Sequence, residues 1–187
     1  MSDIPSYLQD GADLLTKDGF ATGDIWYHGT SSSLADSIKS HGLKRSGDRA
    51  IKQAAKSTMA TIGNCYTEST EPVFLTQSKE LAYYWAQQTV RERSVRFEGE
   101  EGAVVFSVEL PEEQSAKVRP DVGAASLLML AEGEAYMAHV AKIYQDCSAG
   151  VLDIDLMNAH RLEYLNKLGM VYINEDIDAE FVSLVSR

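Results

Sequence analysis

The chain has 187 residues, of which 44% are hydrophobic and 24% are charged. Such a composition is typical of a folded globular protein, and the length suits one domain better than two. The formal net charge of −11 argues against an extended nucleic-acid footprint, because such footprints depend on many lysine and arginine contacts to phosphate. We therefore expect one domain over residues 1–187, with residues 1–22 as a helical N-terminal extension.

The sequence also restricts location and redox chemistry. No apolar run approaches the roughly 20 residues that span a bilayer, and the start of the chain lacks the basic flank and apolar stretch of a secretion signal. We expect a cytoplasmic protein, or one delivered into a host cytoplasm, with no membrane partner. Cys65 and Cys147 are too few for a disulfide framework and are not spaced as metal ligands, so we expect reduced thiols and no metal.

The predicted elements begin with a short amphipathic helix within residues 1–22, where apolar residues recur at near-helical spacing. A strand is predicted over residues 25–28. Ser33 and Asp36 then have the order of a capping box, which predicts a helix that starts there and ends at Gly42. This helix is expected to pack on the sheet and to support the segment that precedes it.

Residues 44–70 form a long polar stretch without a clear period. A loop of that length in a compact domain is commonly a lid or a binding loop, and this one has room for a short helix at residues 49–58. The loop contains a basic cluster, which we interpret as a solvated loop with a local basic patch as the alternative, formed by Lys44, Arg45, Arg49, Lys52 and Lys56.

The second half of the chain alternates between strand and helix patterns. Ser78 is a predicted N-cap, and Pro111 is a predicted strand stop. Residues 91–102 are mixed in charge and are predicted to be an exposed connection. We predict strands at 73–75, 103–110, 170–173 and 181–185, a helix at 79–90, apolar-periodic segments at 124–130 and 134–144, and a helix at 153–168.

Three short motifs occur in an order that is informative. They are Tyr27-His28-Gly29-Thr30, then Val73-Phe74-Leu75-Thr76 followed by Ala82-Tyr83-Tyr84-Trp85-Ala86, and finally Ala179-Glu180-Phe181-Val182. In this order they resemble the ADP-ribosyltransferase superfamily, in particular its His-Tyr-Glu branch with the poly(ADP-ribose) polymerases and the diphtheria-like toxins. The first motif is also similar to that of the RNA 2′-phosphotransferases, which share the fold.

The resemblance implies an α+β fold, a split β-sandwich of mixed strand direction with flanking helices and an NAD cleft between its halves. His28 would hydrogen-bond the adenosine ribose, since one imidazole nitrogen can be fixed by the protein while the other meets the ligand. Gly29 would offer backbone hydrogen bonds to the nicotinamide carboxamide, because a residue without a side chain lets the ligand lie close. Thr30 or Ser31 could add a hydroxyl.

The resemblance also implies aromatic contacts with nicotinamide. Phe74 stands where the polymerases usually have tyrosine, so the ring is kept and the hydroxyl is lost. On the following helix Tyr84 is the first choice for stacking on nicotinamide, with Tyr83 and Trp85 as neighbours that an uncertain register leaves open. The alternative for this aromatic stripe is ordinary core packing.

The implied catalytic residue is Glu180. Breaking the bond between nicotinamide and ribose builds positive charge on the ribose, which a nearby carboxylate can stabilise while it orients the acceptor. Glu175, in the same acidic stretch, is the rival, and an acidic turn can also be simply solvated.

We therefore expect an NAD-dependent mono-ADP-ribosyltransferase that releases nicotinamide and modifies an unidentified protein or nucleic acid, as a toxin or effector would. If water were the acceptor, the protein would be an NAD glycohydrolase. One alternative is an RNA 2′-phosphotransferase-like enzyme, which would need phosphate-binding arginines. Another, kept open by Phe74, is a non-catalytic regulator that binds NAD or ADP-ribose. The candidate arginines are Arg45, Arg49, Arg91 and Arg93.

Overall fold

The computed structural model describes residues 4–187 apart from 49, 51, 54–69, 122 and 124–129. The predicted helix at 49–58, the segment at 124–130, Arg49, Lys56 and Cys65 therefore lie wholly or largely outside the described residues. Among the described residues, no helix has the length and apolar character needed to cross a membrane.

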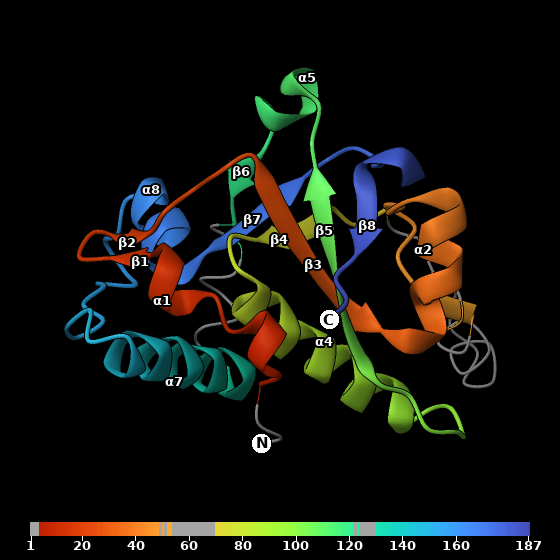
Figure 1. Cartoon of the computed structure of the whole chain (residues 1–187), viewed down its shortest axis with the longest axis horizontal. Helices are drawn as coiled ribbons and strands as arrows, with labels where there is room; N and C mark the ends of the chain where they lie inside the picture. The colour runs from red at the N-terminus through yellow and green to blue at the C-terminus, as the bar shows by residue number, and fades with distance from the viewer. Residues whose placement is uncertain (1–3, 49, 51, 54–69, 122, 124–129) are drawn as a thin grey trace.

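The chain forms a mixed α/β structure with an antiparallel sheet (Figure 1). Its strands are β1 (Leu15–Thr16), β2 (Gly19–Phe20), β3 (Ile25–Ser31), β4 (Val73–Thr76), β5 (Ala103–Glu109), β6 (Arg119–Pro120), β7 (Met170–Ile173) and β8 (Val182–Leu184). Its α-helices are α1 (Gly11–Leu14), α2 (Ala35–His41), α4 (Lys79–Ser94), α5 (Glu112–Ser115), α7 (Ala131–Asp146) and α8 (Arg161–Glu163). Single turns of other helix types are η1 (Ser6–Leu8), η2 (Ser32–Leu34), η3 (Tyr164–Leu168) and η4 (Ala179–Phe181).

The six-stranded sheet has the order β6-β7-β4-β3-β5-β8 and divides in its middle. β3 pairs with β5 along its whole length, from Ile25 opposite Glu109 to Ser31 opposite Ala103. With β4, in contrast, β3 pairs only at Tyr27 opposite Thr76. The sheet therefore consists of two three-stranded halves, β6-β7-β4 and β3-β5-β8, that are joined at one position. We call the boundary between these halves the split.

The expected mixture of helices and strands is present, whereas the expected mixed strand direction is wrong. Every pair of neighbouring strands in the described part of the chain is antiparallel. The described strands also form one continuous large sheet and a separate two-stranded hairpin, β1-β2, rather than two stacked sheets.

Helices cover both faces of the sheet. On one face α4 lies across β3 and β5, and α7 packs against the far side of α4 through an apolar cluster that includes Leu81, Tyr84, Tyr136 and Val140. On the other face α2 contributes to a second cluster with the inner strands. The sheet half that carries β3 is therefore enclosed between α4 and α2.

Gly29 allows the close approach of α4 to β3. A Cβ atom added to Gly29 would lie 1.7 Å from the carbonyl oxygen of Ala82 and 2.8 Å from the backbone nitrogen of Ala86. No other residue has room at this position, because the obstacle is helix backbone and cannot rotate away. Ala82 and Ala86 are one helical turn apart, so three small residues form the contact.

The predicted N-terminal helix is wrong for most of residues 1–22. These residues form two short turns and the β1-β2 hairpin, with Leu8 and Phe20 buried in separate apolar clusters. Gly19, in the hairpin, has φ 116°, a conformation that glycine adopts at no steric cost. Asp10 precedes the four-residue α1 and accepts a hydrogen bond from the backbone nitrogen of Lys79 (2.8 Å), which links this segment to the start of α4.

The predicted helix at 153–168 is wrong over its first half. Asp155 accepts hydrogen bonds from the backbone nitrogens of Met157 and Asn158, a local turn that competes with helix formation. The helix starts only at α8, where His160 and Glu163 form a capping box, and ends at Gly169 with φ 65°. Ser78 is confirmed as the N-cap of α4, since its Oγ accepts from the backbone nitrogen of Leu81.

We predict that Gly29→Ala destabilises the protein by about 3 kcal/mol or more, because the new methyl group would force α4 away from β3. Denaturant unfolding monitored by circular dichroism measures this effect.

The matched control is Gly23→Ala, since a Cβ at Gly23 would meet no atom within 4 Å. That variant is expected to stay within about 0.5 kcal/mol of wild type. Equal stability of the two variants would contradict the close approach described for Gly29.

Candidate functional site

His28 is fixed across the split of the sheet. Its Nδ1 lies 2.9 Å from the backbone carbonyl oxygen of Phe74 on β4. A carbonyl oxygen can only accept, so Nδ1 carries the hydrogen and donates it, which leaves Nε2 of the neutral ring as an acceptor. Burial lowers the pKa of His28, and the bond to Phe74 opposes this only in part, so the ring is neutral at pH 7. His28 therefore presents an acceptor nitrogen at the split.

The other residues of the first motif are used by the fold. β3 continues to Ser31, so the motif lies within a strand and not at its end. Side chains alternate along a strand, which turns Gly29 toward α4 and His28 to the opposite face. Thr30 and Ser31 are buried, and the Ser31 Oγ donates to Glu101 and accepts from the Ser33 backbone nitrogen. The Ser31 hydroxyl is thus engaged within the protein.

Phe74 is the exposed aromatic residue beside the split. Its side chain is 47% exposed, and it lies directly opposite Tyr172 of β7 in the strand register. Both rings point to the face of the sheet that carries Tyr27 and α4, opposite to the face of His28, because Thr76, two residues along β4 from Phe74, is the cross-strand partner of Tyr27. An aromatic ligand ring could stack there.

The aromatic residues of α4 divide between two environments. Tyr84, the expected nicotinamide contact, is only 3% exposed and stacks on His139 with ring centroids 4.9 Å apart. Trp85 packs on Tyr136 at 4.8 Å, so both residues belong to the core between α4 and α7. Tyr83 lies on another side of the helix, half-buried, and lines a pocket of about 250 Å³ together with Arg91. Tyr83 therefore lines a pocket, whereas Tyr84 and Trp85 pack in the core.

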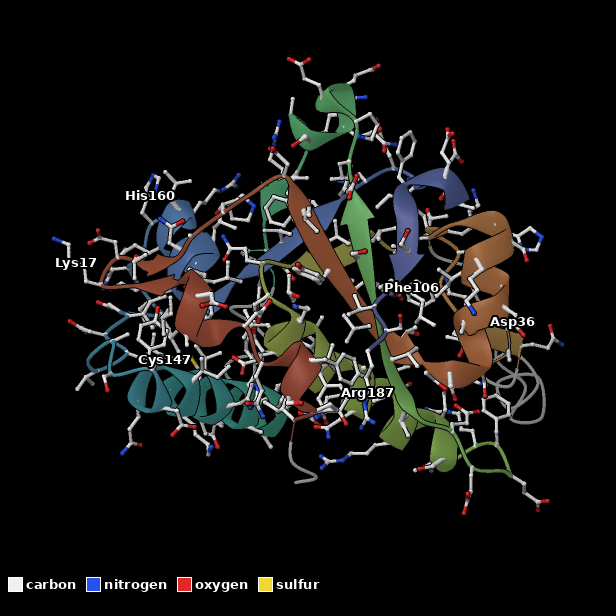
Figure 2. The ribbon with its side chains drawn as sticks, in the orientation of Figure 1. Lys17, Asp36, Phe106, Cys147, His160 and Arg187 are labelled. Atoms are coloured by element: carbon white, nitrogen blue, oxygen red, sulfur yellow. The ribbon has the colours of Figure 1, made fainter. Side chains whose placement is uncertain are left out.

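The structure does not bring Glu180 to His28. Glu180 is exposed in η4, just before β8. The residue of β8 in the same cross-strand row as His28 is Leu184. Phe106 of β5, which Figure 2 labels, lies between them in this row. Glu180 lies outside this row, because it precedes β8 in the turn η4. Glu175 does not replace Glu180, because its carboxylate is already paired. It accepts a hydrogen bond from Lys117 Nζ at 2.8 Å, and this bond lowers the pKa of Glu175.

A buried ion network that the sequence pattern did not reveal lies at the far end of β3. Arg93, 6% exposed, donates from Nε and Nη2 to the two carboxylate oxygens of Glu101 (2.7 and 3.0 Å) and from Nη1 to Asp48. Ser31 donates to the same Glu101. The hydrogen bonds from Arg93 are the main reason that the pKa of Glu101 falls to about 2. Residues 91–102 are therefore more than the exposed connection that was predicted.

The candidate arginines differ in exposure and in their hydrogen-bond partners. Arg93 is saturated by carboxylates, whereas Arg91 is exposed and donates to Gln88. The backbone nitrogen of Arg45 donates to Asp176 in the β7–β8 connection. Nothing in the local sequence distinguishes Arg93 from Arg91, so only the fold could identify the buried one.

A second group of titratable residues joins the N-terminal segment to α4. Glu80 is buried and accepts from the Gly11 backbone nitrogen at 3.0 Å. Burial, and then the nearby charge of Asp10, raise the pKa of Glu80 to about 7. A carboxyl group with such a pKa suits proton transfer, but Glu80 lies against Gly11, Ile143 and Cys147 and not at the split. Its role here is to hold the N-terminal segment.

Within the described residues, no group of three or more His, Cys, Asp or Glu side chains is arranged to hold a metal ion. Comparison with known proteins gives no match, since no family model, curated protein or solved structure matches the chain. The resemblance to ADP-ribosyltransferases therefore rests on the three sequence motifs.

We predict that Arg93→Met lowers the free energy of unfolding by about 3–5 kcal/mol, because it removes the buried cation that Glu101 and Asp48 share. Urea unfolding at neutral pH measures the loss. The control is Arg91→Met, at an exposed site on the same helix, whose free energy of unfolding should stay within about 0.5 kcal/mol of wild type.

The Arg93 effect also has a pH dependence. The folded-state pKa of Glu101 is about 2, below its unfolded value of 4.5, so the stabilisation is complete above pH 4.5 and is lost as the pH falls toward 2. The difference between wild type and Arg93→Met should shrink over that window. A difference that is equally large at pH 2.5 and pH 7 would contradict the network.

We predict the opposite pH trend for Glu80→Gln. The folded-state pKa of Glu80 is raised from 4.5 to about 7, so wild type loses stability as the pH rises through this window, whereas the neutral glutamine loses none. The stability of Glu80→Gln relative to wild type should rise by more than about 1 kcal/mol between pH 5 and pH 8. Thermal unfolding of both proteins across this range measures the trend, and a constant difference would refute the raised pKa.

Proposed function

We propose that this protein binds NAD at the split and transfers ADP-ribose from it to an acceptor, as a mono-ADP-ribosyltransferase. The observation that carries the proposal is the imidazole of His28, which is held by the Phe74 carbonyl with an accepting Nε2. A ribose hydroxyl is a donor that suits this nitrogen. The order of the three sequence motifs supports the same reading.

The residues around the split agree with the proposal in part. Phe74 holds His28 through its backbone carbonyl, but its exposed ring points to the opposite face of the sheet from the His28 side chain, the face on which Tyr83 of α4 lies. The face of β3 to which Gly29 points is covered by α4. The backbone contact between Gly29 and nicotinamide is therefore the least supported of the implied contacts.

The proposed reaction breaks the bond between C1′ of the ribose and the nicotinamide nitrogen. The electron pair leaves with nicotinamide, the acceptor nucleophile forms a new bond to C1′, and the acceptor loses its proton. A carboxylate stabilises the positive charge that develops on the ribose. Glu180 remains the candidate for this carboxylate on its sequence motif.

A second function is favoured by one observation, the position of Glu180 in η4, outside the cross-strand row of His28. With its carboxylate away from the ligand, the protein would bind NAD or ADP-ribose without cleaving it, as a regulator. RNA 2′-phosphotransfer is less well supported, because Arg93 is already paired with Glu101 and Asp48.

The test is to measure NAD binding by calorimetry and nicotinamide release by chromatography, with cell lysate as a source of acceptors. We predict that His28→Ala weakens NAD binding about tenfold, the loss expected for one well-placed hydrogen bond. His41→Ala is the matched control, since His41 is exposed on α2 and contacts only the Ser37 carbonyl among the described residues.

Glu180→Ala separates the two functions. Retained NAD binding with loss of nicotinamide release would support transfer with Glu180 as the catalytic residue. Binding without release by wild type would establish the regulator instead. NAD binding that His28→Ala and His41→Ala affect equally, or no binding by wild type, would overturn the proposal as a whole.

A further inference from the structure

Residues 4–13, which we call the strap, lie against the α4 side of the sheet (Figure 1). Leu8 is the large apolar side chain of the strap that is buried, at 2% exposure, and it packs with Ala82 of α4 and Val105 of β5. Tyr83 of α4 is half-buried against the same cluster. The strap therefore covers an apolar face of the protein with few anchoring side chains of its own.

Two carboxylates fasten the strap to α4 in a reciprocal way. Asp10 of the strap accepts hydrogen bonds from the backbone nitrogens of Lys79 and Glu80, the first two residues of α4, at 2.8 and 3.4 Å. The Glu80 carboxylate accepts in return from the backbone nitrogen of Gly11, the first residue of α1, at 3.0 Å. Each carboxylate thus satisfies free N–H groups at the start of the helix on the other side of the interface.

This interface buries two acidic groups without a cation between them. Asp10 is 7% exposed and Glu80 is 9% exposed. The two lysines whose charges act on the pair are engaged elsewhere, because Lys79 Nζ donates to a strap carbonyl at 3.3 Å and Lys142 Nζ pairs with Asp146 at 2.7 Å. Two like charges in a buried site repel each other, so this arrangement favours a proton on one of the two groups.

Among the described residues, the other titratable groups that face the pair do not supply a cation at pH 7. Burial lowers the pKa of His139 and raises the pKa values of Tyr27 and Cys147, which keeps these three groups neutral. Asp146 adds further negative charge. These groups lie on β3, on α7 and just after α7; they are Tyr27, His139, Asp146 and Cys147.

We propose that the strap is a proton-dependent cover. It stays docked on α4 while Asp10 and Glu80 hold one proton between them, and it detaches when both groups are ionised. Detachment brings the two carboxylates into water, which solvates their charges. It also uncovers Ala82, Val105 and Tyr83, so an apolar face of the protein opens as the proton is lost.

Detachment leaves the rest of the fold in place, because the strap ends before the β1-β2 hairpin. The carbonyl oxygen of Leu14 accepts from the Ala21 backbone nitrogen at 2.8 Å, which ties residue 14 to this hairpin. Phe20 of the hairpin is 3% exposed and packs in the cluster between α4 and α7. A hinge just before Leu14 is therefore sufficient to release the strap.

The direction of the pH dependence follows from Glu80. Burial, and then the charge of Asp10, raise its pKa from 4.5 to about 7 in the docked state, whereas a detached strap leaves Glu80 in water with a pKa near 4.5. Docking is therefore strongest below pH 4.5 and weakens as the pH rises through about 7.

The test is hydrogen–deuterium exchange of the full chain between pH 5 and pH 8, expressed as protection factors that correct for the effect of pH on intrinsic exchange. The protection factors of the strap amides should fall at least about tenfold across this range, whereas those of β3 and β5 should stay within about twofold. Thermal unfolding checks that each variant below is folded.

Three variants identify the groups that hold the proton. Glu80→Gln is neutral at every pH, so its strap should stay protected throughout. If this variant fails to dock its strap, Asp10→Asn gives the answer, because it leaves one charge in place of two and should also flatten the pH dependence. Asp13→Asn is the matched control, since Asp13 is an exposed acid of the same segment, and it should behave as wild type does.

Three results would overturn the proposal. They are strap protection that does not change with pH in wild type, an equal fall of protection in the strap and in β3 and β5, and the same pH dependence in wild type, Glu80→Gln and Asp10→Asn. The outcome is independent of the proposed NAD site, since His28 points to the other face of β3 and His28→Ala should show the pH dependence of wild type.

Discussion

The backbone of α4 lies against the backbone of β3 at Gly29, and much of the structure depends on this contact. Three small residues, Gly29, Ala82 and Ala86, fix both the distance and the rotation of the helix. Because the alanines face the strand, the side of α4 that carries Tyr84 must face α7, where it is buried with Tyr136. The same contact therefore decides which aromatic residues are core and which remain accessible.

The second constraint is the single pairing between β3 and β4. A strand that parts from its neighbour leaves backbone groups without partners, and the fold must supply others. At Phe74 the partner is the His28 imidazole, which takes the place of a backbone donor. This hydrogen bond fixes the tautomer of His28 and so decides that the free nitrogen is an acceptor. The proposed recognition of a ribose hydroxyl follows from this arrangement.

Features encoded by local sequence could be predicted. The strands at β3, β4, β5 and β7 follow from runs of branched and aromatic residues, and the start of α4 follows from Ser78. The helix predicted before residue 161 is wrong, because the Asp155 side chain accepts a hydrogen bond from the backbone nitrogen of Met157 in a local turn. Strand register and helix rotation decide that Arg93 and Tyr84 are buried and that Glu180 is exposed. These are tertiary features that no local pattern contains.

The claim that NAD is held at His28 is tested most directly by two-bond ¹H–¹⁵N NMR spectra of the histidine side chains, recorded at pH 7 with and without NAD. The account predicts that free His28 is neutral with its hydrogen on Nδ1, and that NAD shifts the His28 Nε2 signal while the His41 signals stay unchanged. A protonated His28, a hydrogen on Nε2, or equal responses of His28 and His41 to NAD would contradict it.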